Sequence, residues 1–271
     1  MKKVFYYYIV ATVLMLVSCN KFLDTSPKDT ITTDNYYQNE TQLNAALTNV
    51  YGIMMSWCYG RTGNALSHSL DYSDEDILNY SSTLNSDPLK MGGFAYTYTN
   101  SVLDGLWQAL YSAIASVNLL EANLHNADAT TSADTRNYIM AQALFLRGYA
   151  YYLLGSHWGG VPLRTSTLSI DNLSIARSSL AETYAQAVAD MEAALPYLKT
   201  PAETGTPSRI SQTAAKAVLA RVFLTMASPG TKIGLNEPKY YDSVIYYTVF
   251  LRRTPSLMFS MRGIILRQQG V

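Results

Sequence analysis

The side chains best suited to recognising a ligand gather in one irregular segment, residues 58–100. The whole chain has 22 tyrosines against 7 phenylalanines, and a tyrosine ring offers a flat apolar face with a polar rim. In this segment tyrosines are interspersed with acidic residues and glycines without a sustained period, as at Tyr72, Asp74, Tyr80, Tyr96 and Tyr98. A long irregular insert between helices is usually functional, so we expect it to supply a binding surface. The simpler interpretation is that each ring packs on the helices.

Cys19 is a second residue with a distinct chemistry. Residues 1–3 include two lysines and residues 4–17 are apolar, a run shorter than the ~20 residues of a membrane span but typical of a signal peptide. Leu16 stands three positions before the cysteine and Ser18 directly before it, as in a lipobox. We therefore expect cleavage before Cys19 and acylation of Cys19, which would tether an exported protein to a membrane. The alternative is a leader that holds a cysteine by chance.

Patterns for catalysis, cofactors and metals are missing from the sequence. The three histidines, His68, His125 and His157, are dispersed and lack zinc spacing. The acidic run at 71–76 lacks the alternating ligands and the glycine of an EF-hand, so a solvated loop is favoured over a calcium site. No nucleophile elbow, Walker loop or dinucleotide fingerprint is present. We predict no catalytic residue, no cofactor and no metal.

The charge distribution argues against a nucleic-acid partner. All 20 acidic residues lie within residues 19–248, whereas 6 of the 20 basic residues lie outside that range. This part of the chain therefore has a net charge of −6 and offers no basic face for a phosphate backbone. The two cysteines exclude a disulfide-rich scaffold.

Six amphipathic stretches predict the helices that position these residues. Apolar side chains recur at helical spacing near residues 39–57, 101–120, 135–154, 179–198, 211–226 and 236–248. Three of these stretches begin with a pair typical of a capping box, namely Asn39 with Gln42, Ser101 with Asp104, and Ser179 with Glu182. We expect the third helix to end near Leu154, stopped by Gly155, Gly159, Gly160 and Pro162.

These elements predict an all-α fold, since no strand pattern accompanies them. Short links favour antiparallel neighbours. Alanine-rich faces at 141–150, 185–194 and 214–220 allow close approach of the tetratricopeptide kind, although no strict repeat of about 34 residues is visible. The prediction is tetratricopeptide-like antiparallel helix pairs with an irregular, loop-rich insert.

The chain divides into four predicted parts. Residues 1–18 are a lipoprotein signal peptide and residues 19–38 an extended, polar tether. Residues 39–248 are the helical domain. Residues 249–271 form a basic tail with four arginines and no acid.

An ordered set of motifs resembles the N-terminal portion of SusD/RagB proteins. The strongest likeness is residues 143–152, which carry Arg147, followed by Gly-Gly-Val-Pro-Leu at 159–163. The other similar segments are 19–24, 31–36, 43–51, Trp107 with Tyr111 and Asn118, Arg177, Asp190 and 209–220. The likeness runs to about residue 248. It implies a helical domain of the same family.

The resemblance also implies a function. Such a protein is lipid-anchored in the cell outer membrane, captures oligosaccharides and passes them to a SusC-like TonB-dependent transporter. The family's binding surface draws partly on the irregular segment after the first helix. The glycan-binding candidates, whose rings would stack on sugars and whose polar groups would bond to them, are therefore Tyr72, Asp74, Tyr80, Asn85, Tyr96 and Tyr98. Trp107 lies in the apolar stripe of its helix and is expected in the core, and Trp158 is expected to fill the turn at Gly159 and Gly160.

Three other interpretations stand beside this one. The first is a helical-repeat scaffold that binds only a protein partner. The second is a glycoside hydrolase, which needs two carboxylates about 5–9 Å apart; the resemblance argues against an enzyme. The third is a non-functional fragment, because the family pattern fails after Tyr247 and residues 249–271 resemble a truncated or frameshifted end.

Overall fold

The computed structural model describes residues 36–58, 87, 90, 95, 97–128, 130–229 and 234–252. Every regular element in these ranges is helical. The α-helices are α2 (Glu40–Cys58), α5 (Ser101–Asn123), α6 (Ala133–Trp158), α7 (Leu180–Ala194), α8 (Pro201–Thr204), α9 (Gln212–Ala227) and α10 (Tyr240–Arg252). The short 3-10 helices are η2 (Leu124–Asn126), η3 (Ile170–Asn172) and η4 (Leu195–Tyr197).

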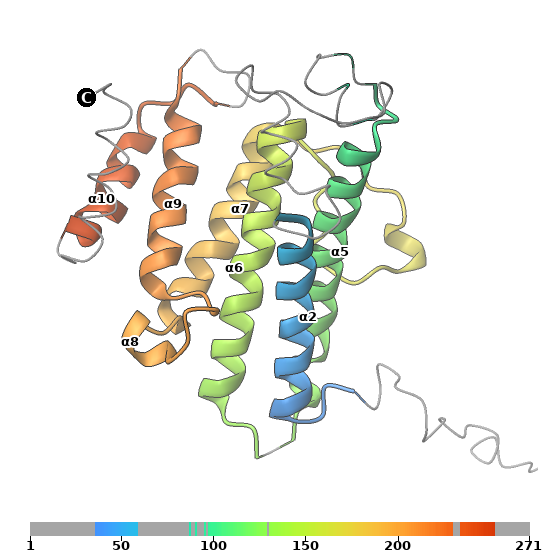
Figure 1. Ribbon diagram of the computed structural model, residues 1–271, viewed down its shortest axis with the longest axis vertical. Coiled ribbons are helices and arrows are strands. Elements are labelled where there is room, and N and C mark those ends of the chain that lie inside the picture. The colour runs from blue at the N-terminus through green and yellow to red at the C-terminus, as the bar shows by residue number, and fades with distance from the viewer. Residues whose placement is uncertain are drawn as a thin grey trace, which may run out of the picture. The chain divides into compact units, whose positions relative to one another are not determined.

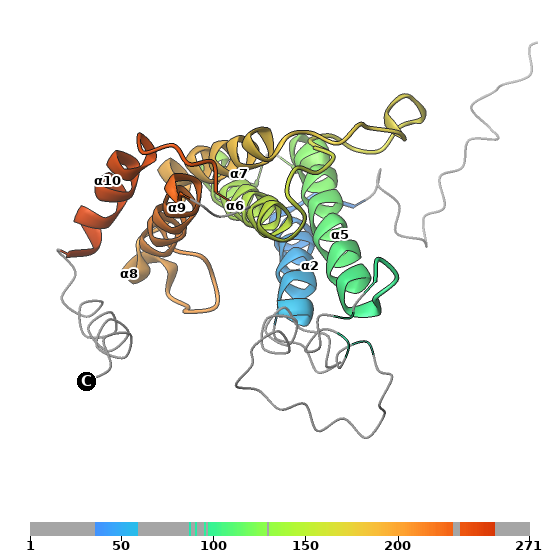
Figure 2. The ribbon, with the colours of Figure 1, turned by 90° about the horizontal axis from the view of Figure 1, so that it is seen from above.

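Consecutive long helices run antiparallel (Figure 1). α2 and α5 pack together and both contact α6, α6 packs on α7, and α9 pairs with α10. Seen from above, α6 lies between the α2–α5 pair on one side and α7 with α9 on the other (Figure 2). The predicted all-α, tetratricopeptide-like arrangement of helix pairs is therefore confirmed. Most of the predicted insert, including residues 59–86, lies outside the described residues.

The core forms where the apolar stripes of these helices face one another. Its largest fully buried side chains come from five helices and include Leu43, Leu47, Leu106, Leu110, Ile114, Ile139, Leu154, Met191 and Leu219. Each such burial contributes about 1.5–3 kcal/mol, so tertiary packing rather than helix propensity holds the elements. Within the described ranges, no helix combines the length and apolar character needed to cross a membrane.

Two predicted helix starts are confirmed by their hydrogen bonds. The Ser179 side chain accepts from the backbone N–H of Glu182, and the Glu182 carboxylate accepts from the N–H of Ser179, which completes a capping box. At α2, Asn39 Oδ1 accepts from the N–H of Gln42 at 3.0 Å. Both contacts satisfy donors that have no partner within the helix.

The start of α5 differs from the predicted pair Ser101 and Asp104. The N-cap is Asn100, one residue earlier, and its side chain accepts from the first free N–H groups of the helix. Asp104 instead accepts from the side chain of Gln108 at 2.7 Å. A further cap contact comes from another segment, since Asp87 accepts from the N–H of Ser101, the first residue of the helix, at 2.8 Å.

Of the predicted stop residues of α6, Gly155 is wrong, because the helix continues to Trp158, and Gly159 is confirmed as its C-cap. A Cβ atom at Gly155 would lie 2.6 Å from Cε1 of Tyr184 in α7. A Cβ atom at Gly148, two turns earlier, would lie 2.6 Å from the carbonyl oxygen of Ala187. These glycines therefore allow close packing of α6 on α7 rather than ending the helix. The end comes at Gly159, whose φ of 75° suits glycine.

α10 begins four residues after the expected start at Asn236, which lies outside the helix with a φ of 54°. Its buried anchor is Tyr247, whose ring stacks on Phe223 of α9 with centroids 5.7 Å apart. The Tyr247 hydroxyl donates to Glu192 Oε1 at 2.7 Å. Ile245, one of the apolar residues of the predicted stretch 236–248, is 58% exposed.

Candidate functional site

Tyr98 is the glycan-binding candidate that falls in the described residues. It occupies a turn directly before α5, and its side chain is 97% exposed. Hydrogen bonds brace this turn, because the hydroxyls of Thr97 and Thr99 lie 2.8 Å apart and the Asn100 amide donates to the Asp87 carbonyl at 3.0 Å. The ring is thus presented to solvent from a fixed turn.

The remaining candidates, Tyr72, Asp74, Tyr80, Asn85 and Tyr96, lie outside the described residues. So do Cys19 and the acidic run at 71–76. Their predicted roles stay predictions. In the part of the chain that the structure describes, no group of three or more His, Cys, Asp or Glu side chains could hold a metal ion.

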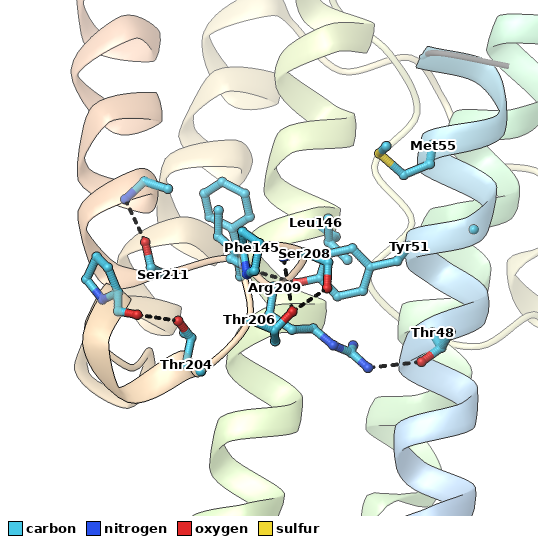
Figure 3. Close-up of a pocket in the computed structure, with 16 residues that line it drawn as sticks. Thr48, Tyr51, Met55, Phe145, Leu146, Thr204, Thr206, Ser208, Arg209 and Ser211 are labelled. Atoms are coloured by element: carbon cyan, nitrogen blue, oxygen red, sulfur yellow. Dashed lines mark hydrogen bonds between the residues drawn. The ribbon is translucent and has the colours of Figure 1, made fainter. Parts of the chain in front are cut away.

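A cavity of about 880 Å³ opens between α2, α6 and the segment that joins α8 to α9 (Figure 3). We call it the Arg209 cavity, after the side chain that crosses it. Its α2 and α6 walls are largely apolar, with Met55, Phe145 and Leu146. The opposite wall offers hydroxyl groups, including those of Thr206 and Ser208.

Arg209 and Tyr51 link the two walls of this cavity. Arg209 Nη2 donates to Thr48 Oγ1 at 3.0 Å, and its guanidinium carbon lies 5.0 Å from the centroid of the Tyr51 ring. The Tyr51 hydroxyl accepts from the N–H of Ile210 at 3.0 Å and donates to Gln142 Oε1 at 3.1 Å. Burial raises the pKa of Tyr51, while the Ile210 N–H and the Arg209 charge oppose that rise.

A second cavity, of about 680 Å³, lies between α5 and the segment after α6. Trp107 and Tyr111 line its α5 side, with ring centroids 4.8 Å apart. Leu168 and Leu173 line the other side and are 61% and 62% exposed. Trp107 is half-buried, which corrects its expected place in the core. It also meets Trp158 edge-on at 5.3 Å.

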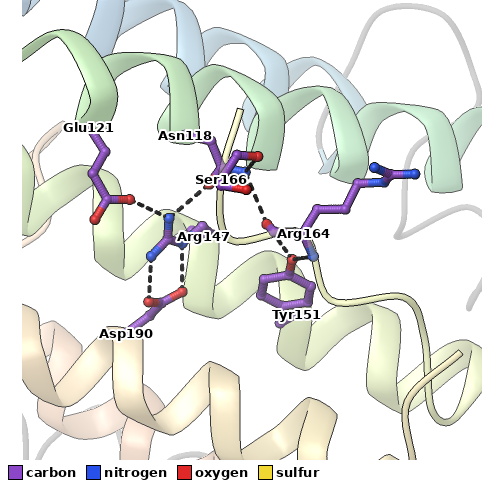
Figure 4. Close-up of polar contacts among 7 residues, drawn as sticks. All are labelled: Asn118, Glu121, Arg147, Tyr151, Arg164, Ser166 and Asp190. Carbon is purple, nitrogen blue, oxygen red and sulfur yellow. Dashed lines mark hydrogen bonds and ion pairs between the residues drawn. The ribbon is translucent and has the colours of Figure 1, made fainter. Parts of the chain in front are cut away.

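Arg147 is the centre of a buried polar network that joins three helices (Figure 4). Its guanidinium donates to both carboxylate oxygens of Asp190 at 2.8 Å. Its Nη1 donates to Asn118 Oδ1 at 2.8 Å and to Glu121 Oε2 at 2.6 Å. Burial acts to lower the pKa of Arg147, but Asp190 and then Glu121 outweigh burial and raise it. The ion pair therefore stays charged and fixes α5, α6 and α7 together.

The same network holds the wall of the second cavity. The Asn118 amide donates to the carbonyls of Arg164 and Ser166, each at 3.0 Å. The Tyr151 hydroxyl donates to the Arg164 carbonyl at 2.8 Å and accepts from its N–H at 2.7 Å. These bonds fix the course of the backbone after α6, so the buried network positions a surface segment.

A helical-repeat fold with open cavities and an exposed aromatic turn is typical of binding proteins. Residues 21–224 match the SusD-like family that is described as starch-binding and associating with the outer membrane. The chain belongs to this family.

Individual relatives agree with this membership. A SusD-like protein of Formosa agariphila is 25% identical over 232 residues, 81% of this chain and 42% of that protein. The chain thus spans about two-fifths of the length of this relative. A surface glycan-binding protein of Bacteroides uniformis has a similar structure, with a TM-score of 0.68 and 19% identity, over 80% of this chain and 47% of that one. A laminarin-binding SusD-like protein also has a similar structure, with a TM-score of 0.60 and 24% identity, over 70% of this chain and 41% of that one.

Proposed function

We propose that this chain is a glycan-binding lipoprotein of the outer membrane, which captures oligosaccharides and passes them to a SusC-like TonB-dependent transporter. Membership of the SusD-like family supports this proposal. The descriptions of two structurally similar proteins, as surface glycan-binding and laminarin-binding, support the ligand class. The role is binding and delivery, without a catalytic step.

The single observation in the structure that supports sugar binding most is the position of Tyr98. The other tyrosines of the described helices largely serve packing, as at Tyr151 and Tyr184, which are fully buried. Tyr98 contributes nothing to the core at 97% exposure, and it stands near the end of the Tyr-rich segment 58–100. A flat ring held in solvent is suited to stacking on a sugar face.

The anchoring part of the proposal rests on Cys19. The lipobox that ends at this residue would carry acyl chains, each buried CH₂ contributing about 0.8 kcal/mol to membrane binding. Intact-mass measurement of the protein from membranes of an expressing bacterium tests this step. Cleavage before Cys19 with added acyl mass is expected, and an unmodified cysteine would contradict it.

Calorimetric titration of the purified chain with laminarin and with soluble starch tests the glycan-binding proposal. Binding of at least one polysaccharide, without release of shorter products over hours, is expected. Release of reducing sugar would favour a hydrolase instead. Lack of binding to either, repeated with a wider glycan panel, would contradict the proposal.

A protein-interaction scaffold is the second candidate function, and one surface favours it. The segment after α6 exposes three aliphatic side chains next to the second cavity: Leu168, Ile170 and Leu173. Exposed apolar groups that lie together often mark a protein contact. Co-purification of a protein partner that is lost on changing Ile170→Asp, with no glycan bound, would favour this function.

A further inference from the structure

The Arg209 cavity has an uncompensated positive charge. Of the described residues that line it, Arg209 is the sole charged one. The closest acidic residue along the chain, Glu203, directs its carboxylate to the N–H and hydroxyl of Thr200, at 2.8 and 2.7 Å. No carboxylate among the described residues forms an ion pair with Arg209.

The hydrogen bonding of Arg209 is also incomplete. Its Nη1 atom is buried and has no hydrogen-bond partner among the described residues, while Nη2 donates to the Thr48 hydroxyl. Arg147 provides the contrast within the same fold, because its guanidinium contacts two carboxylates and an amide. Arg209 is only partly buried and lacks such a pair among the described residues, so its guanidinium keeps donors that a ligand can use.

The rest of the cavity suits a saccharide rather than a simple anion. The Thr206 and Ser208 hydroxyls lie 2.8 Å apart on one wall and can exchange this mutual bond for bonds to sugar hydroxyls. The opposite wall is apolar, and its Met55 side chain is 54% exposed. A volume of about 880 Å³ is within the range of small-ligand sites.

We propose that this cavity binds an acidic sugar, a uronate unit of an oligosaccharide, through Arg209. The guanidinium turns from Thr48 and donates two parallel hydrogen bonds to the sugar carboxylate, the strongest geometry open to an arginine. This inference rests on the proposed glycan-binding function and adds a ligand class to it. It also adds a second contact region, formed by residues other than Tyr98.

Calorimetric titration with tetragalacturonic acid and, as the neutral match, maltotetraose tests this proposal. The acid oligosaccharide is expected to bind more tightly than the neutral one, and its binding to weaken as salt increases. Changing Arg209→Gln should weaken it by roughly tenfold or more, because a charged hydrogen bond is lost. Arg221→Gln on the exposed face of α9 removes the same charge and should have little effect.

Thermal unfolding of each variant shows whether it is folded. If Arg209→Gln fails to fold, Arg209→Lys replaces it, since a point charge keeps the attraction and loses the two-bond geometry. Uronate binding that is indifferent to both salt and Arg209 would overturn the inference. Binding of neutral but not acidic sugars would overturn it and leave the proposed function standing, whereas binding of no sugar would contradict both. An Arg209-dependent preference for a glutamate-rich peptide over tetragalacturonic acid would assign the cavity to a protein instead.

Discussion

Tyrosine side chains have two distinct roles in this chain, and burial separates them. Tyr151 lies in the core, where its hydroxyl bridges the N–H and carbonyl of Arg164 and burial raises its pKa. Tyr98 is 97% exposed on a braced turn. Only the second kind of ring can stack on a sugar from solution. The binding energy of a glycan is therefore expected to depend on tyrosines that add nothing to stability.

Changing Tyr98→Ala should weaken binding to the glycan that the chain recognises about fivefold or more, because an aromatic contact contributes about 1 kcal/mol. The unfolding midpoint should stay within a degree of the original. Tyr246→Ala is the matched control, since Tyr246 is 74% exposed on α10. Calorimetric titration of both variants measures the difference, and equal affinities would exclude Tyr98 from the binding surface.

Changing Arg147→Ala should destabilise the fold by about 3–5 kcal/mol, because Asp190 would be left as an uncompensated buried charge. The double change Arg147→Met with Asp190→Leu should cost less than Arg147→Ala alone, since it removes both charges and keeps apolar volume. Urea unfolding of the variants measures these free energies. If the double change costs more than Arg147→Ala alone, the two side chains are not acting as a pair.

His157 should make stability depend on pH. Its Nδ1 lies 2.8 Å from the Leu153 carbonyl, which can only accept, so Nδ1 carries the hydrogen. The buried Nε2 has no hydrogen-bond partner in the part of the chain that the structure describes. Burial lowers the pKa of His157, against the opposing effect of the Leu153 carbonyl. The unfolded chain then takes up the proton more readily, so stability falls as pH drops below about 6.5. His157→Gln should reduce the loss of unfolding free energy between pH 7.5 and 5.5, measured in urea; an unchanged loss would exclude this residue as its cause.

A helix was predictable from the sequence where its periodic apolar face and a capping residue within the first turn indicate the same start. The capping box at Ser179 is an example, because both partners lie within one turn and no distant contact is needed. Gly155 shows the limit of that reasoning. A glycine in a helical pattern indicates either an end or a close packing partner, and only the position of Tyr184 in α7 decides between them. The start of α5 is a second example, since one of its cap contacts, from Asp87 to the N–H of Ser101, comes from another segment.

The packing of α6 on α7 gives a prediction at the scale of the element. Gly148→Ala should destabilise the fold by about 1–3 kcal/mol, because the added methyl group would meet the carbonyl oxygen of Ala187 at 2.6 Å. Gly52→Ala in α2 is the control, since no described atom lies within 4 Å of its added Cβ. That change should stabilise the chain by up to about 1 kcal/mol. Thermal unfolding of both variants measures these changes. If Gly52→Ala lowered the unfolding midpoint more than Gly148→Ala, the result would contradict the packing described for α6 on α7.

At the scale of the whole molecule, the fold was more predictable than the site. The pairing of the helices follows from their apolar faces and from the short connections between neighbouring helices. The cavities depend on contacts between residues far apart in the chain, such as the 159 positions between Tyr51 and Ile210 or the 43 between Arg147 and Asp190. The sequence marks Arg147, Asn118 and Asp190 as family positions, but it does not say that they meet. The sequence around Arg209 likewise does not reveal that this side chain lacks a carboxylate partner among the described residues.

Thermal unfolding of the chain with and without a panel of polysaccharides tests the central proposal most directly, because it asks at once whether the chain is folded and whether a glycan binds that fold. A cooperative transition raised by at least one glycan is expected. At a ligand concentration of 100 times Kd the stabilisation should be about 2.7 kcal/mol, and the midpoint should rise by roughly 5–10 °C for a domain of this size. A cooperative transition that no glycan shifts, or a transition without cooperativity, would contradict the proposal that this chain is a glycan-binding module.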